Sequence, residues 1–107
     1  MPIVKAQIQG TIMSVFFLVQ IETISDEGMY REYIGKVIPI ITKYGGEYVL
    51  RSEKITIMTG NWNLKRILLI RFASKENIQE CLQSGEYKEI AHLREISTTS
   101  KAIIIEE

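Results

Sequence analysis

A run of alternating side chains that begins at Val15 predicts the first strand of the fold. Positions of one parity are apolar from Val15 to Ile21. Positions of the other parity begin apolar at Phe16 and end polar at Glu22. Because successive side chains of a strand point to opposite faces, the first set indicates a core face and the second a mixed face. Residues 1–14 show no comparable pattern, and we interpret them as either an extra edge strand or an arm.

Apolar residues at helical spacing follow and predict a helix that ends near Tyr44. Ser25 or Asp26 caps its start, because short polar side chains accept hydrogen bonds from the free amide groups there. Pro39 falls inside the pattern and costs about 3 kcal/mol in an ideal helix interior. We therefore interpret the segment as one kinked helix, with two short helices as the alternative. The periodic positions are Tyr30, Tyr33, Ile34, Val37, Ile41 and Tyr44.

A pair of glycines at positions 45 and 46 separates this helix from a strand-like run. Glycine adopts positive φ without steric cost, so we predict that Gly45 has a positive φ where the chain leaves the helix. Residues 47–51 and 54–58 then predict a bent strand or a short hairpin arm, and residues 60–63 predict a turn.

The second half of the chain predicts a third strand, a helix or helix pair, and a closing strand. Arg66–Phe72 has a nearly continuous apolar centre, and Ser74 caps the helix that follows. A break at Ser84 precedes a further short helix at 86–96, and residues 101–106 form the last strand. The resulting βαββαβ order is that of an α+β, ferredoxin-like fold with an antiparallel sheet.

Composition narrows the class of protein. The chain has 107 residues, 46% of them hydrophobic and 24% charged, which is typical of one globular domain, here residues 15–107. Thirteen basic and thirteen acidic residues cancel, so we expect neither nucleic acid nor a membrane as a partner. Cys81 is the only cysteine, which suits a reducing compartment. No leader opens the sequence and no apolar run approaches ~20 residues, so we expect a cytoplasmic protein.

Several short motifs follow one another in a characteristic order. They are Tyr30-x-x-Tyr33, Pro39, Tyr44-Gly45-Gly46, Arg51, Gly60-x-Trp62, Ser84-Gly85-Glu86-Tyr87 and Arg94. In this order the chain resembles the uncharacterised family catalogued as domain of unknown function 1330, over nearly its whole length. The resemblance implies a ferredoxin-like fold whose sheets pair face to face as a dimeric α/β barrel. Two positions depart from the family pattern: Gly85 replaces a usual proline, and Arg71 replaces a common glutamate.

The sheet face that the helices leave open carries the first candidate site residues. By strand parity Arg71 projects from this face, and Gln20 and Glu22 share it. Arg71 either forms a structural ion pair with Glu22, which we favour, or binds a ligand carboxylate through its planar fork.

Two further candidates lie outside the strands that carry Arg71. Arg51 follows the tyrosine–glycine segment and either binds an anion or, as we favour, forms a cross-strand salt bridge. His92 is the only histidine, and Glu89 precedes it at helical spacing. Because a closed metal site needs more protein ligands than this pair, we expect a surface histidine, no metal site and no cofactor. Arg94 has a structural explanation in the dipole of its helix.

No complete catalytic constellation appears in the sequence. It contains no glycine-x-serine-x-glycine elbow and no phosphate-binding loop, and Cys81 falls on an apolar helix face where we expect it buried and inert. The leading hypothesis is a homodimer that is non-catalytic, or has no demonstrable catalytic activity, and can hold a small ligand in the cleft between sheet and helices. The alternative is a cofactor-free small-molecule enzyme, monooxygenase- or isomerase-like. An enclosed apolar cavity with Arg71, Gln20 or His92 pointing inward would favour this alternative.

A homodimer follows from the second apolar face of the sheet. Helices of this topology cover one face only, so the other face has no cover within its own chain. Each large apolar side chain that stays exposed to water lacks about 1.5–3 kcal/mol of burial free energy. A two-fold partner would cover this sheet face on both copies at once. The residues that form this face are Phe16, Leu18, Ile67 and Leu69.

Overall fold

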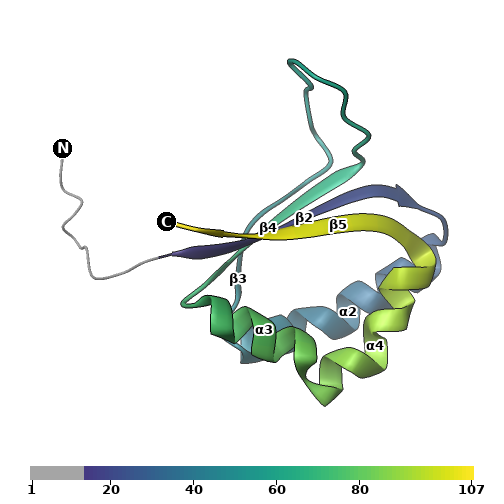
Figure 1. Cartoon of the computed structure of the whole chain (residues 1–107). Helices are drawn as coiled ribbons and strands as arrows, with labels where there is room; N and C mark the ends of the chain where they lie inside the picture. The colour runs from purple at the N-terminus through teal and green to yellow at the C-terminus, as the bar shows by residue number, and fades with distance from the viewer. Residues whose placement is uncertain (1–13) are drawn as a thin grey trace, which may run out of the picture.

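The sheet has four strands in the order β3-β4-β2-β5, and every neighbouring pair is antiparallel. This computed structural model describes residues 14–107, so the predicted N-terminal arm or strand lies outside the described residues apart from Ser14. Three helices cover one face of the sheet (Figure 1). The predicted α+β, ferredoxin-like order is confirmed, with the second helical segment divided in two. The elements are β2 (Val15–Ile24), α2 (Glu27–Lys43), β3 (Glu47–Ser52), β4 (Arg66–Phe72), α3 (Lys75–Gln83), α4 (Gly85–Ser97) and β5 (Thr98–Glu106).

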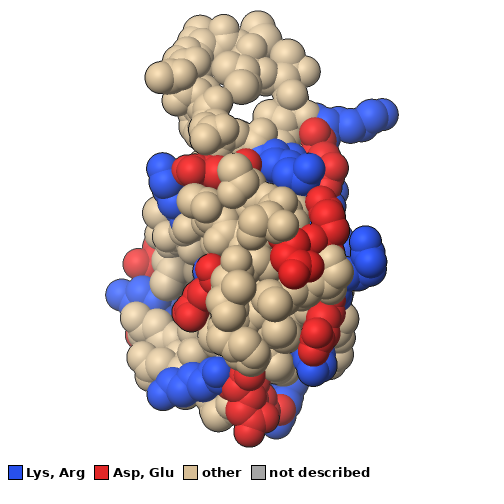
Figure 2. Space-filling view, turned by 90° about the vertical axis from the view of Figure 1, so that its right-hand side faces the viewer, with Lys and Arg blue, Asp and Glu red and all other residues tan. Residues whose placement is uncertain are grey.

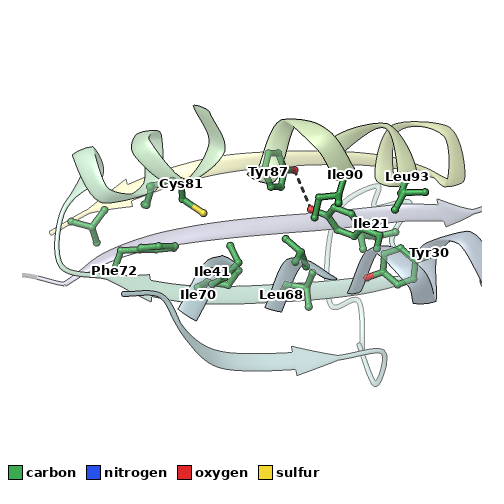
Figure 3. Close-up of a cluster of buried hydrophobic side chains, with 14 residues drawn as sticks. Ile21, Tyr30, Ile41, Leu68, Ile70, Phe72, Cys81, Tyr87, Ile90 and Leu93 are labelled. Carbon is green, nitrogen blue, oxygen red and sulfur yellow. Dashed lines mark hydrogen bonds between the residues drawn. The ribbon is translucent and has the colours of Figure 1, made fainter. Parts of the chain in front are cut away.

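The core lies between the sheet and the three helices (Figure 3). The predicted alternation of β2 is confirmed, because Val15 and Ile21 are buried while Phe17 and Val19 pack against the core from the same face. Cys81 is fully buried, as its position on the apolar face of α3 predicts. The other buried apolar residues are Tyr30, Tyr33, Val37, Ile41, Leu68, Ile70, Phe72, Ile78, Tyr87, Ile90 and Leu93.

α2 is one continuous helix that contains Pro39, which confirms the single-helix interpretation. Of the two predicted caps, Asp26 is the one used, because its carboxylate accepts a hydrogen bond from the Met29 amide at 2.9 Å. The Ser25 hydroxyl instead donates to the carbonyl of Ser97 at 3.2 Å. Ser25 therefore ties the end of β2 to the end of α4.

The two glycines after α2 have different tasks. Gly45 has φ +87°, which confirms the predicted left-handed exit from the helix. At Gly46 an added Cβ would lie 2.5 Å from Ile41 Cγ2 and 2.7 Å from Phe72 Cζ. Gly46 is therefore required by the close approach of α2 to β4, a requirement that the sequence did not reveal.

The segment between β3 and β4 is a loop, so the strand or hairpin predicted at 54–58 is wrong. β3 ends where the Ser52 hydroxyl accepts a hydrogen bond from the Lys54 amide at 3.0 Å, a local turn that competes with strand pairing. Residues 53–65 project beyond the sheet, away from the helices (Figure 1). Residues 55–64 carry no charged side chain, so the tip appears as an uncharged arm in Figure 2.

Ser84 stands at the predicted break between α3 and α4 and serves both helices. Its hydroxyl donates to the Cys81 carbonyl at 2.7 Å and accepts from the Tyr87 amide at 3.1 Å. Ser74 caps α3 as predicted. β5 begins at Thr98, three residues before the predicted start at 101. Within residues 14–107, no helix is both long and apolar enough to span a membrane.

The open face of the sheet is apolar at its centre. Leu18 lies opposite Leu69 on β4 and Ile103 on β5, and Phe16 lies opposite Ile105. Ile103 is 55% exposed, and Ile105 is also exposed. β5 therefore extends the apolar face that the sequence had placed on β2 and β4 only.

Candidate functional site

A cavity of about 420 Å³ lies between the sheet and the helices. Its wall is mainly apolar, with side chains from both central strands and from α2. The polar residues in the wall are a few tyrosines, one arginine, one lysine and one serine. The apolar part includes Phe17, Val19, Ile21, Val37, Ile41, Leu68 and Ile70, and the polar part includes Tyr30, Tyr33, Tyr48, Tyr87, Arg94 and Ser100.

Four of these polar residues form one connected network. The hydroxyls of Tyr33 and Tyr87 share a hydrogen bond of 3.0 Å, drawn as the dashed line at Tyr87 in Figure 3. Arg94 Nε donates to the Tyr87 hydroxyl at 3.3 Å, and the Arg94 Nη1 donates to the Ser100 hydroxyl at 3.1 Å. The network thus joins α2, α4 and β5 at one part of the cavity wall.

Local sequence places these groups together. Tyr87 and Arg94 are seven residues apart, which is two helical turns, so they share one side of α4. Ser100 lies opposite the buried Ile21 in the sheet and therefore faces the helices. Arg94 also lies in the last turn of α4, where the helix dipole favours a cation, as the sequence predicts.

The Arg94 guanidinium is a partly buried cation without a close buried counter-ion. Its side chain is 28% exposed, and the carboxylate nearest to it among residues 14–107 is that of Glu95, 3.7 Å away and 63% exposed. Burial raises the pKa of Tyr33 well above its usual value, and the adjacent Tyr87 adds to this effect. The Tyr33 hydroxyl therefore stays protonated and neutral. The hydrogen-bond partners of the Arg94 guanidinium are hydroxyl groups and carry no negative charge.

A second basic group near the cavity is already neutralised. Arg66 forms an ion pair with Glu53, and its Nη1 donates to the Tyr30 hydroxyl at 3.4 Å. Its guanidinium also lies 5.4 Å from the centre of the Tyr30 ring. Lys101 contributes to the cavity wall, but its ammonium group lies 3.0 Å from Glu22. Arg94 differs from both in that its carboxylate neighbour within residues 14–107, the exposed Glu95, lies farther away, at 3.7 Å.

The three candidates predicted on the open sheet face lie there and do not line the cavity. Arg71 forms an ion pair, but with Glu47 at 2.8 Å rather than with Glu22. The reason is strand order, because β3 lies beside β4 and places Glu47 directly opposite Arg71. Glu22 pairs with Lys101 instead, and Gln20 is half-buried opposite Ile67.

The two remaining candidates also lie outside the cavity. Arg51 is exposed and lies 5.7 Å from the centre of the Tyr48 ring, and no salt bridge to it occurs within residues 14–107. It borders a second, shallower hollow of about 310 Å³. His92 is exposed on α4. No group of three or more metal-ligating side chains exists in the described part of the chain. Since neither Arg71, Gln20 nor His92 lines the apolar cavity, the arrangement that would favour the enzyme alternative is not seen.

Comparison with solved structures shows the fold. A protein of unknown function from Rhodopseudomonas palustris superposes with TM-score 0.75 at 13% identity, over 94% of this chain and 87% of that one. SnoaB, a cofactor-independent oxygenase from Streptomyces nogalater, has TM-score 0.63 at 10% identity, over 86% and 90%. A protein from Jannaschia sp. described as dimeric and ferredoxin-like has TM-score 0.61 at 11% identity, over 88% and 99%.

At these identities the likeness concerns the fold and carries no activity across. A search of the curated proteins finds no significant match. A family match, in contrast, covers residues 14–107, which is nearly the whole chain. The chain belongs to the family described as Domain of unknown function (DUF1330).

Proposed function

We propose that the protein is a homodimer in which each protomer binds one small, mainly apolar molecule in the cavity between sheet and helices. The cavity itself carries this proposal. Its volume of about 420 Å³ falls within the range of about 300–1,000 Å³ that is common for small-molecule sites. Its wall is mainly apolar with a few convergent polar groups, which is the usual composition of such sites.

The side chains around the cavity belong to regular elements rather than to loops. Val19 is on the central strand, Tyr33 is in the middle of α2, and Tyr87 follows the capped start of α4. A site built on strands and helices holds its shape before the ligand arrives, which reduces the ordering cost of binding. The apolar wall provides the affinity, and the Tyr33–Tyr87–Arg94–Ser100 network fixes the ligand's orientation.

The open sheet face supports assembly with a second copy. Leu18, Leu69 and Ile103 lie side by side at its centre, and burial of each such side chain contributes about 1.5–3 kcal/mol. A two-fold contact covers the same patch on both copies. The protein from Jannaschia sp. with this fold is described as dimeric, which agrees with the proposal. The uncharged arm adds Ile57, Met58 and Trp62 as exposed apolar side chains, with Met58 85% exposed.

The candidates on the open face then belong to the interface. Arg71, Gln20 and Glu22 surround the apolar patch. Paired charges at an interface determine the register in which two copies meet, and they contribute less to the affinity between the copies. Cys81 is a buried, free thiol. Free thiols are common in a reducing environment, so we propose the cytoplasm as the location of the protein.

Two measurements test the proposal. Light scattering at micromolar concentration should give the mass of two chains, and a well-folded monomer would contradict the assembly. Titration with naphthamide, a neutral two-ring probe, should show saturable binding to the unmodified protein. Val19→Phe places a ring in the cavity and should abolish this binding, whereas Gln79→Phe adds the same ring on an exposed site of α3 and should not. Equal binding by both variants would contradict the cavity as the site.

A further inference from the structure

The cavity has an electrostatic imbalance that restricts what it can bind. Arg94 places a guanidinium in its wall, 28% exposed, and its nearest carboxylate within residues 14–107 is the exposed Glu95 at 3.7 Å. A cation that is partly removed from water loses hydration energy that neutral hydroxyls restore only in part. An anionic group in the cavity would restore it.

The groups around Arg94 are suited to an oxygen acceptor. Tyr33 keeps its proton because burial raises its pKa, and the hydroxyl of Ser100 has a rotatable hydrogen. The guanidinium uses one N–H on Tyr87 and one on Ser100 and has further donors beyond these. A carboxylate accepts several hydrogen bonds at once and matches the planar fork of arginine.

The remaining charges limit the ligand to a single negative charge. Arg66 is paired with Glu53, and Lys101 is paired with Glu22, so neither is free to neutralise a second charge. The rest of the wall is mainly apolar, with Phe17, Val19 and Leu68 among its side chains. A doubly charged group such as a phosphate would lack a second counter-charge there.

We infer that Arg94, with Tyr33, Tyr87 and Ser100 beside it, recognises a single carboxylate on a small apolar ligand whose body of one or two rings fills the rest of the cavity. This inference rests on the proposed binding function and names its ligand class.

The test compares naphthoate with naphthamide, which has the same ring body without the charge. On the unmodified protein, naphthoate should bind about 10- to 100-fold more tightly, as expected for a charge-assisted hydrogen-bonded pair. This comparison needs no substitution and is therefore independent of whether a variant folds. Naphthol serves as a third probe. If naphthol binds more tightly than naphthoate, the recognised group is a hydroxyl and the assignment of a carboxylate is overturned.

Variants then locate the recognition. Arg94→Met should remove the preference for naphthoate, measured as the ratio of its affinity to that of naphthamide for the same variant, and Arg94→Lys should keep part of this preference. Arg31→Met removes a charge from an exposed site of α2 and should leave the preference intact. A preference that survives Arg94→Met in a folded protein would overturn the assignment. Equal binding of both probes would overturn the inference but not the binding function, whereas no binding of any probe would overturn both.

Discussion

The hydroxyl groups of Tyr33 and Tyr87 lie 3.0 Å apart and connect the middle of α2 to the start of α4. The two rings meet edge to face, with their centres 6.3 Å apart. Because Tyr87 also accepts from Arg94, which donates to Ser100, a single chain of hydrogen bonds crosses from α2 through α4 to β5. The same groups that hold these elements together therefore supply the polar part of the cavity.

Tyr87→Phe should destabilise the protein by about 1–3 kcal/mol, because Tyr33 and Arg94 both lose a partner in a partly buried place. Urea unfolding followed by circular dichroism measures the change. Tyr44→Phe is the control, since its ring packs against the core outside this network. Similar losses for the two variants would show that the network contributes nothing.

Gly46→Ala should cost about 1–3 kcal/mol of stability, because the new methyl group overlaps Ile41 and Phe72. Gly35 provides the matched comparison, since a Cβ there meets no atom within 4 Å. In the middle of α2, Gly35→Ala should instead stabilise by about 0.5–1 kcal/mol. Thermal unfolding of both variants checks the opposite signs, and two changes of the same sign would contradict the account.

Cys81 should react slowly with a bulky thiol reagent in the native protein. The side chain is fully buried, and burial raises its pKa to about 11, so little thiolate exists near neutral pH. We expect labelling at pH 8 to be limited by opening of the fold and to become fast in denaturant. Rapid labelling of the native protein would contradict the burial of this thiol.

Stability should fall at alkaline pH. Burial raises the pKa of Cys81 from 9.0 to about 11 and that of Tyr48 from 10.0 to about 12. In this window the unfolded chain releases protons that the folded protein retains, so the free energy of unfolding decreases as the pH rises. The contribution of these two protonated groups to the free energy of unfolding is fully present below about pH 9. It is lost as the pH passes about 11 for Cys81 and about 12 for Tyr48. Urea titrations between pH 8 and 11 should show the decrease, and Tyr48→Phe should make it shallower.

Leu18→Glu should separate the two subunits. The substitution places a charge between Leu69 and Ile103, at the centre of the open sheet face. Gln79→Glu adds the same charge on the exposed surface of α3 and should leave the assembly intact. Sedimentation analysis of both variants, with circular dichroism as a check of folding, distinguishes the outcomes. A Leu18→Glu protein that remains dimeric would place the subunit contact elsewhere.

The sequence was sufficient where the deciding signal is local. The alternation from Val15, the cap at Ser74, the break at Ser84 and the glycine exit at Gly45 each depend on neighbouring residues, and all are confirmed. The prediction for residues 54–58 is wrong because a strand also needs a partner strand, and the chain turns away from the sheet after Ser52.

The site was harder to predict because it depends on how distant elements pack. Tyr33 and Tyr87 have the helical spacing of core residues, and only the packing of α2 against α4 shows that their hydroxyls meet. Arg94 was explained by the helix dipole alone, although it also lines the cavity. Strand parity placed Arg71 on the correct face but could not supply the strand order that pairs it with Glu47.

The position of a bound probe decides whether the cavity is the binding site. A crystal of the protein grown with bromonaphthoate would reveal the bromine by its anomalous scattering. We predict one bromine per protomer inside the cavity between β2, α2 and α4, with the probe's carboxylate beside Arg94. An ordered probe found only on the open sheet face, or a cavity that stays without a probe at saturating concentration, would contradict it.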